Sequence, residues 1–388
     1  MRLKGILLAL TIGVVVHGNG QTTIQNIVNG NTSFAFDYLR SMEDKNVFIS
    51  PFSISTAMAM TYAGAKNSTA EEFNKVMHFN HGDLGFHSAY GEYQQELSNN
   101  MSQVEWNLAN KLWGFGSPNF EKQFLSINSD LYNAPIVFGA NEARINKWVE
   151  QQTKGKIRDL LPPGTISPDT RLILTNAVYF KANWKYEFEK KDTKKQKFHL
   201  ANGKKSTVDL MYQEGAFNYY QTSDYQCIRL PYKGDKQSMV VVLPKEQIEI
   251  GKIQEDLEKD FLTNLRMYGK SNVQVYLPKF KLEYKELLGE YLIAKGMPQS
   301  FSETADFSGM LKSESLWIDA VIHQAFVEVN EEGTEAAAAT AVVMTTESLS
   351  PSKPKPIIFR ADRPFLFFIV DDATQSVLFM GKMMNPTE

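Results

Sequence analysis

Near its C-terminal end the chain carries the stretch Glu331-Glu332-Gly333-Thr334-Glu335-Ala336-Ala337-Ala338-Ala339-Thr340-Ala341-Val342-Val343-Met344. This stretch lacks the large side chains that anchor a segment in a core. Its even-numbered positions from Thr334 to Met344 are all uncharged, and the next carboxylates in the region, Glu335 and Glu347, are odd-numbered. Because side chains alternate between the two faces of a strand, one face of this segment could enter a sheet without burying a charge.

A helix is the alternative for this stretch, since four consecutive alanines have the best helix propensity available. Gly333 interrupts its start, however, and the β-branched residues that follow fit strands better. Downstream, the Pro-rich run 350–356 favours an extended and exposed chain without three backbone donors. The region therefore predicts an exposed loop whose first half could become a strand.

The remainder of the chain predicts one mixed α+β domain with large antiparallel sheets, without repeats or a linker. A content of 43% hydrophobic residues in 388 is enough for a sizeable core. The first third of the mature chain is expected to be mainly helical. Expected helices cover Ser33–Met42, Ser53–Ala65, Lys252–Tyr268 and Lys285–Gly296, and expected strands lie near Leu172–Leu174 and over Ser238–Leu243, Asn272–Leu277 and Trp317–Val329.

The N-terminus has the layout of a secretory signal peptide. Arg2 and Lys4 precede an apolar run that is too short to span a bilayer, and small and polar residues follow up to Gly20. We expect residues 1–20 to be removed, with cleavage after Gly18 as an option, and residues 21–388 to form the secreted, extracellular domain. A buried strand or helix is the alternative for the apolar run.

The charge balance of 41 basic and 44 acidic residues, which becomes -5 once Arg2 and Lys4 are removed, does not favour binding to nucleic acid or to an anionic membrane. The densest basic patch alternates with acidic residues and is typical of a solvated hairpin; a polyanion site is its alternative. Its lysines are Lys190, Lys191, Lys194, Lys195, Lys197, Lys204 and Lys205.

A single cysteine, Cys227, excludes an internal disulfide, and its neighbours predict a half-buried strand thiol, with an intermolecular partner as the alternative. We expect a monomer. Three glycosylation sequons begin at Asn31, Asn67 and Asn100, and in a secreted chain we expect at least one to be used.

No catalytic constellation is apparent. The chain lacks a His-Glu-x-x-His motif, a Gly-x-Ser-x-Gly motif and a phosphate loop. His78, His81 and His87 are close in sequence, but no cysteine or second cluster supports a metal site. We therefore expect no catalytic residue, no metal and no cofactor.

Three further segments, taken in order, resemble the serpin family over essentially the whole mature length. They are Asn46-Val47-Phe48-Ile49-Ser50-Pro51-Phe52-Ser53-Ile54-Ser55-Thr56-Ala57, Thr175-Asn176-Ala177-Val178-Tyr179-Phe180-Lys181-Ala182-Asn183-Trp184 and Phe359-Arg360-Ala361-Asp362-Arg363-Pro364-Phe365-Leu366-Phe367. The resemblance implies a single α+β domain with three β-sheets, about nine helices and an exposed reactive-centre loop over about 331–356. The secreted form with one cysteine and an alanine-rich hinge looks most similar to serpins of tick saliva.

The resemblance also implies roles for particular residues. Residues 331–340 would be the hinge that inserts into the central sheet after a protease cuts the loop. Ser50, Ser53, Asn176 and His323 resemble the polar cluster beneath the sheet, which the family calls the shutter. Glu331, Lys279 and Trp184 resemble the group at the top of the sheet, called the breach.

Counting from Gly333 as the family does places the scissile bond at Glu347-Ser348, with Thr346 or Ser348 as the fallback for the first position. A glutamate there disfavours trypsin-like and chymotrypsin-like pockets and suits a protease with a basic specificity pocket. The function implied is irreversible, suicide-type inhibition of a serine protease, with a role in host defence or haemostasis if the source is tick saliva. The alternative is a non-inhibitory serpin that binds a ligand or a protein.

Overall fold

The computed structural model describes residues 18–79, 84–116, 119–257, 262, 269–313, 315–334 and 355–388. Within them lie eight α-helices, in agreement with the expected number of about nine. They are α1 (Gly18–Leu39), α2 (Pro51–Tyr62), α3 (Asn67–Val76), α4 (Leu84–Asn100), α5 (Lys122–Ser126), α6 (Glu142–Gln152), α7 (Ile250–Asp256) and α9 (Gly289–Lys295). A π-helical turn, η1 (Ile127–Leu131), follows α5, and two 3₁₀ turns are η2 (Lys190–Asp192) and η3 (Gln299–Phe301).

The six-stranded sheet has the order β10-β11-β12-β4-β2-β3. All its neighbouring strands are antiparallel except two parallel pairs, β11 with β4 and β2 with β3. Its strands are β10 (Phe280–Leu287), β11 (Ala320–Val329), β12 (Gly333–Thr334), β4 (Leu172–Asn183), β2 (Glu105–Gly114) and β3 (Val137–Phe138).

The other nine strands form a hydrogen-bonded network in two parts that share the long strand β6. The first residues of β6 pair with β5 and its last residues pair with β7, so the six-stranded sheet and these two parts make the three sheets expected. The strands are β1 (Val47–Ile49), β5 (Lys194–His199), β6 (Lys205–Gln221), β7 (Tyr225–Pro231), β8 (Gln237–Pro244), β9 (Lys270–Pro278), β13 (Ile357–Arg360), β14 (Phe365–Asp371) and β15 (Val377–Met383).

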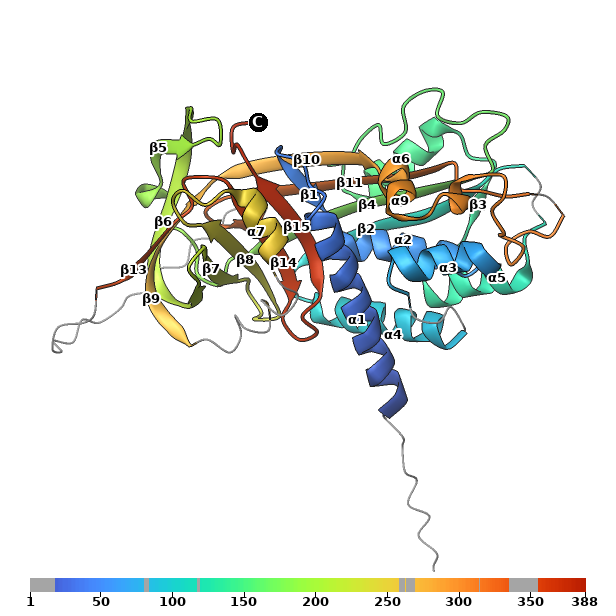
Figure 1. Ribbon diagram of the computed structural model, residues 1–388, viewed down its shortest axis with the longest axis horizontal. Helices are drawn as coiled ribbons and strands as arrows, with labels where there is room; N and C mark the ends of the chain where they lie inside the picture. Colours follow the sequence, from blue (N-terminus) through green and yellow to red (C-terminus); the bar gives the residue numbers. More distant parts are fainter. Residues whose placement is uncertain are drawn as a thin grey trace, which may run out of the picture.

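Helices and sheets separate toward different sides of the molecule. Figure 1 shows the β5–β6–β9–β13 part at one end, and α2, α3, α4 and α5 gathered beneath the other half of the molecule. The six-stranded sheet extends between them. Its long strands β4, β10 and β11 therefore connect the two ends of the fold.

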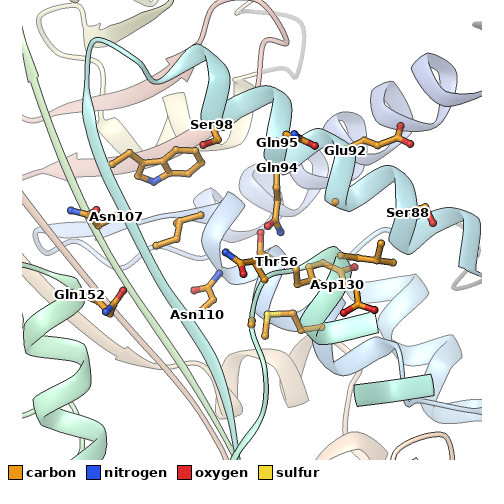
Figure 2. A pocket seen from close by; sticks show the side chains of 18 residues that line it. Thr56, Ser88, Glu92, Gln94, Gln95, Ser98, Asn107, Asn110, Asp130 and Gln152 are labelled. Atoms are coloured by element: carbon orange, nitrogen blue, oxygen red, sulfur yellow. The ribbon is translucent and has the colours of Figure 1, made fainter. Parts of the chain in front are cut away.

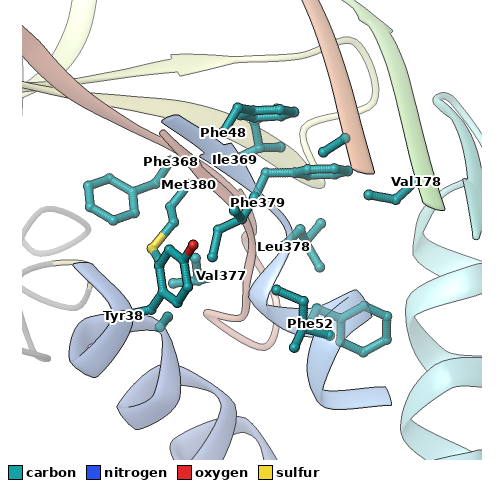
Figure 3. Packing of buried hydrophobic residues seen from close by; sticks show 14 of the residues in the cluster. Tyr38, Phe48, Phe52, Val178, Phe368, Ile369, Val377, Leu378, Phe379 and Met380 are labelled. Atoms are coloured by element: carbon teal, nitrogen blue, oxygen red, sulfur yellow. The ribbon is translucent and has the colours of Figure 1, made fainter. Parts of the chain in front are cut away.

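The main core lies where β14 and β15 meet α1 and α2. Both strands are buried at every position, as expected for strands covered on both faces. Phe48 stacks on Phe379 with ring centroids 5.3 Å apart, and Figure 3 shows these rings above Phe52 and Tyr38 of the two helices. This packing fixes α2, which begins beneath the six-stranded sheet, against β14 and β15 of the nine-stranded network.

Candidate functional site

The predicted hinge begins inside the six-stranded sheet. Gly333 and Thr334 form β12, in which Thr334 pairs with Val329 of β11 on one side and with Ala182 of β4 on the other. Over seven residue pairs toward the other end of the sheet, β11 and β4 pair directly with each other. The first two strand residues of the hinge thus occupy the space where β11 and β4 diverge.

Asn330 closes the turn that joins β11 to β12. Its N–H donates to the Gly333 carbonyl at 2.9 Å, and its carbonyl accepts from the Gly333 N–H at 3.3 Å. Its side-chain Oδ1 accepts from the N–H of Glu332 at 3.0 Å. Strands β11 and β12 are therefore a closed hairpin.

The surroundings of β12 explain why a glycine and a threonine occupy its two positions. A Cβ at Gly333 would lie 2.1 Å from the carbonyl oxygen of Ala182, so this close approach to β4 requires glycine. Thr334 is fully buried, and its hydroxyl lies 2.7 Å from that of Tyr232. The first even-numbered residue thus faces the interior, as the parity of the sequence indicated.

The beginning of the loop departs from the expectation of an exposed segment. Glu331 is only 5% exposed, and Gly333 and Thr334 are buried. Their backbone groups pair within the sheet and its hairpin turn, which stabilises a strand rather than an exposed chain. The expectation of exposure was therefore wrong for Glu331, Gly333 and Thr334, while Glu332 is half-buried.

Glu331 and Lys279 form an ion pair beside the hinge. The Lys279 Nζ lies 3.0 Å from one Glu331 carboxylate oxygen, and the Thr193 hydroxyl donates to the other at 2.9 Å. Burial opposes the charged carboxylate, but the hydrogen bonds from Lys279, from the Glu331 backbone and from Thr193 outweigh it and lower the pKa of Glu331. The carboxylate stays charged and holds the hinge to the end of β9.

Trp184 stabilises the turn at the start of the hinge through hydrogen bonds and ring stacking. Its indole Nε1 donates to the Asn330 carbonyl at 2.9 Å, and its own N–H donates to the Glu332 carbonyl at 2.9 Å. Its ring stacks on Tyr232 with centroids 4.7 Å apart. The structure thus brings all three predicted breach residues, Trp184, Lys279 and Glu331, to the hinge.

Tyr232 belongs to this site but was missed by sequence analysis. It is fully buried directly after β7, with its ring on Trp184 and its hydroxyl on Thr334. Its only sequence signal was a tyrosine at the end of a strand.

The four predicted shutter residues form one buried cluster. Ser50 caps the N-terminus of α2, where its Oγ accepts from the Ser53 N–H and donates to the Leu378 carbonyl at 2.6 Å. Asn176 of β4 donates to the Ser53 carbonyl at 2.5 Å and to the Ser53 Oγ at 2.8 Å. The cluster therefore ties α2 to β4 and β15.

His323 links the cluster to β11. It lies opposite Asn176 in the parallel β11–β4 register, and its Nδ1 hydrogen-bonds the Asn176 Oδ1. Its Nε2 accepts from the Ser50 N–H at 3.2 Å. Because the ring is fully buried, desolvation lowers the pKa of His323 to about 3, so the ring is neutral and Nδ1 carries the proton.

Asn110 of β2 is a fifth member that sequence analysis missed. Its Oδ1 accepts from the Ser53 hydroxyl at 3.0 Å and from Asn176 Nδ2 at 2.7 Å, and its own Nδ2 donates to the Ser53 carbonyl. A lone asparagine in a region expected to be helical gave no signal. Three strands of the sheet are consequently joined to one helix N-terminus.

The rest of the predicted hinge lies outside the described residues, and so does the predicted reactive bond. These are Glu335–Thr340 and Glu347-Ser348.

The basic patch lies on η2 and the β5–β6 hairpin, as expected. Lys190 binds Glu332 at 2.6 Å and Lys195 binds Asp209 at 3.1 Å. Part of the patch is therefore neutralised.

The glycosylation sequons differ in their accessibility. Asn31 is 3% exposed, and its amide contacts Tyr90 and Ser55. A glycan on this nitrogen has no route to solvent in the folded chain, which overturns the expectation for Asn31. Asn67 is exposed at the start of α3 and Asn100 is half-buried at the end of α4.

The cysteine and two of the three histidines singled out in the sequence lie in the packed structure and not in a metal site. Cys227 is fully buried in β7 rather than half-buried, and burial raises the pKa of its thiol. His78 binds Asp37 and His87 contacts Tyr132, while His81 lies outside the described residues. Among the described residues there is no group of three or more potential metal ligands, and none of their helices is long and apolar enough to cross a membrane.

Comparisons with known proteins match this architecture. The family described as "Serpin (serine protease inhibitor)" matches residues 29–386. A serpin-like protein of Thermococcus kodakarensis is 40% identical over 93% of this chain and 86% of its own length, and the leukocyte elastase inhibitor of Homo sapiens is 38% identical over 94% and 100%. The structure of human thyroxine-binding globulin with its ligand superposes with a TM-score of 0.83 at 28% identity, covering 94% of this chain and all of that one.

Proposed function

We propose that this chain, which belongs to the serpin family, is a suicide-type inhibitor of a serine protease. The main support for this proposal is that the hinge strand β12 already lies between β11 and β4. After cleavage of the loop, the rest of the hinge would lengthen β12 and carry the acylated protease with it.

The register of β12 defines where the hinge would insert. Each further hinge residue moves one step back along β4 and β11, so Thr340 would lie opposite both Asn176 and His323. Insertion must therefore break the pairing between these two shutter residues. The hydroxyl of Thr340 offers a donor and an acceptor in its place.

Insertion of the residues that follow Thr334, from Glu335 to Glu347, would move the protease by roughly 43 Å at ~3.3 Å per residue. The small, uncharged residues at even positions would let this strand form before the acyl bond hydrolyses. The chain itself would not turn over a substrate.

Glu347 directs the proposal to a protease with a basic specificity pocket. A carboxylate would remain unpaired in an apolar pocket and would meet a like charge in a trypsin-like one, each costing several kcal/mol. We therefore expect weak inhibition of trypsin-like and chymotrypsin-like proteases.

The second candidate is a non-inhibitory serpin that binds a ligand or a protein, because Glu347 is an unusual bait residue. Incubation with a panel that includes a Glu-specific protease separates the two. An inhibitor forms a complex that survives denaturing electrophoresis, and mass spectrometry finds its cut at Glu347-Ser348. A cleaved loop with fully active protease supports the second candidate instead.

We further propose secretion after removal of residues 1–20, with glycans on Asn67, Asn100 or both. Mass spectrometry of the secreted chain measures both the mature N-terminus and the glycan occupancy. Similarity to tick salivary serpins, and action on host defence or haemostasis, stay predictions of the sequence.

A further inference from the structure

A cavity of about 870 Å³ lies beside β2, away from the hinge. Helix α4 and the segment 130–134 form its walls, and Figure 2 shows Gln94 reaching from α4 toward Thr56 of α2. Trp106, Asn107 and Leu108 are consecutive in β2 and all line it. Because consecutive strand residues point to opposite faces, the cavity extends around the edge of β2.

This edge of β2 is open over most of its length. Strand β4 pairs with one side of β2 from Glu105 to Gly114, but β3 pairs with the other side only at Trp113 and Gly114. Among the described residues, no strand pairs with that second side over residues 105–112. Eight residues at ~3.4 Å each give an edge of about 27 Å, whose backbone groups can accept another strand.

The side chains around this edge suit a peptide backbone. Six carboxamides, each with a donor and an acceptor, line the cavity: Gln94, Gln95, Asn107, Asn110, Asn133 and Gln152. The buried donors Gln94 Nε2, Trp106 Nε1 and Asn107 Nδ2 have no hydrogen-bond partner among the described residues. A peptide carbonyl could pair with these donors after their side chains turn toward the cavity, and each donor would then gain the partner that it lacks.

The charges of the lining select among peptides. Among the described residues that line it, the charged side chains are the exposed carboxylates of Glu92 and Asp130, and none is a lysine, arginine or histidine. A polyanion is disfavoured here, whereas a cationic side chain gains from a nearby carboxylate.

We propose that this cavity is a docking site for an extended peptide segment with basic residues, which adds as a strand to the open edge of β2. Main-chain hydrogen bonds would provide affinity, and Glu92 and Asp130 would select for positive charge. The partner is a protein that presents such a segment. The proposal is independent of protease inhibition.

Asn110 connects the docking site to the shutter. It lines the cavity and also hydrogen-bonds Ser53 and Asn176. A bound strand would therefore contact the cluster that joins β2 to β4 and α2.

The test uses the full chain and a fluorescent, end-blocked heptapeptide of alternating valine and lysine. Gln95→Trp fills the cavity from α4, and Asn99→Trp is the matched control, since Asn99 is uncharged and exposed on the same helix but does not line the cavity. We expect anisotropy to give about tenfold weaker binding for Gln95→Trp and less than twofold change for Asn99→Trp, where tenfold corresponds to ~1.4 kcal/mol. A peptide with glutamate in place of lysine should bind the native chain more weakly than the valine-lysine peptide does.

Amide hydrogen exchange locates the peptide. We expect slower exchange in residues 105–112 when it is bound. Equal binding to both tryptophan variants, or protection of β4 and β11 in place of β2, overturns the proposal by locating the peptide between those strands. Equal affinity for the lysine and glutamate peptides contradicts the role of Glu92 and Asp130.

Discussion

At the scale of single residues, His323 makes stability depend on pH. Its pKa is about 3 in the folded chain and near 6.5 in a model peptide, so the unfolded chain binds its proton first as pH falls. Stabilisation by the neutral ring is complete above pH ~6.5 and declines through that window toward pH ~3, by up to about 1.4 kcal/mol per pH unit.

Urea unfolding between pH 4 and 7 measures this effect in the native chain and in His323→Gln. We expect the native chain to lose stability more steeply with falling pH, because glutamine does not titrate. Carboxylates contribute to both chains, so the difference between the slopes isolates His323. Parallel slopes would show that the ring is not held neutral.

Residue-level prediction succeeded where family resemblance supplied the partners. His323, Asn176, Ser50 and Ser53 could be selected from quoted motifs, and the structure brings all four together. Asn110 could not, because its partners come from segments 57 and 66 residues away and no local pattern reports such contacts.

At the scale of elements, a substitution in β12 can test whether the even-numbered residues of the hinge face the interior. Thr334 is fully buried against Tyr232, so Thr334→Arg would bury an unpaired charge at a cost of several kcal/mol. We expect this variant to be cleaved as a substrate while the yield of covalent complex falls at least tenfold. Titration of protease activity against each variant measures that partition.

Thr334→Val is the matched control. It keeps the volume and loses only the hydrogen bond to Tyr232, for which we expect a loss of about 1 kcal/mol of stability and most of the inhibitory yield retained. Efficient inhibition by Thr334→Arg would contradict burial of the even-numbered face.

Element prediction followed hydrophobic periodicity. The strand expected near Leu172–Leu174 is the start of β4, and Ser238–Leu243 lies within β8. The expected helix Lys285–Gly296 begins instead as the end of β10 and becomes helical at Gly289. β2 was missed within a region expected to be helical, because its mixture of Asn, Lys, Trp and Leu lacks clean alternation.

At the scale of the whole molecule, cleavage of the loop should raise thermal stability. Among the described residues, two hinge residues, Gly333 and Thr334, lie between β11 and β4 in the six-stranded sheet, so insertion of a longer part of the loop would add a central strand. We expect Tm to rise by on the order of 10 °C or more after a cut near Glu347, since ~1 kcal/mol shifts Tm by about 2 °C in a large domain. Calorimetry of intact and cleaved protein measures this, and an unchanged Tm would exclude insertion.

The turn at Asn330 has a kinetic consequence. Forming a new strand usually requires two chain segments to find each other, with an entropy loss that grows with the length of the loop between them. Here that encounter has already occurred, because the Asn330 turn holds β12 beside β11 in the intact chain. Insertion can then proceed as the growth of an existing hairpin, one residue at a time. Its rate would be governed by how fast β11 and β4 separate rather than by a search.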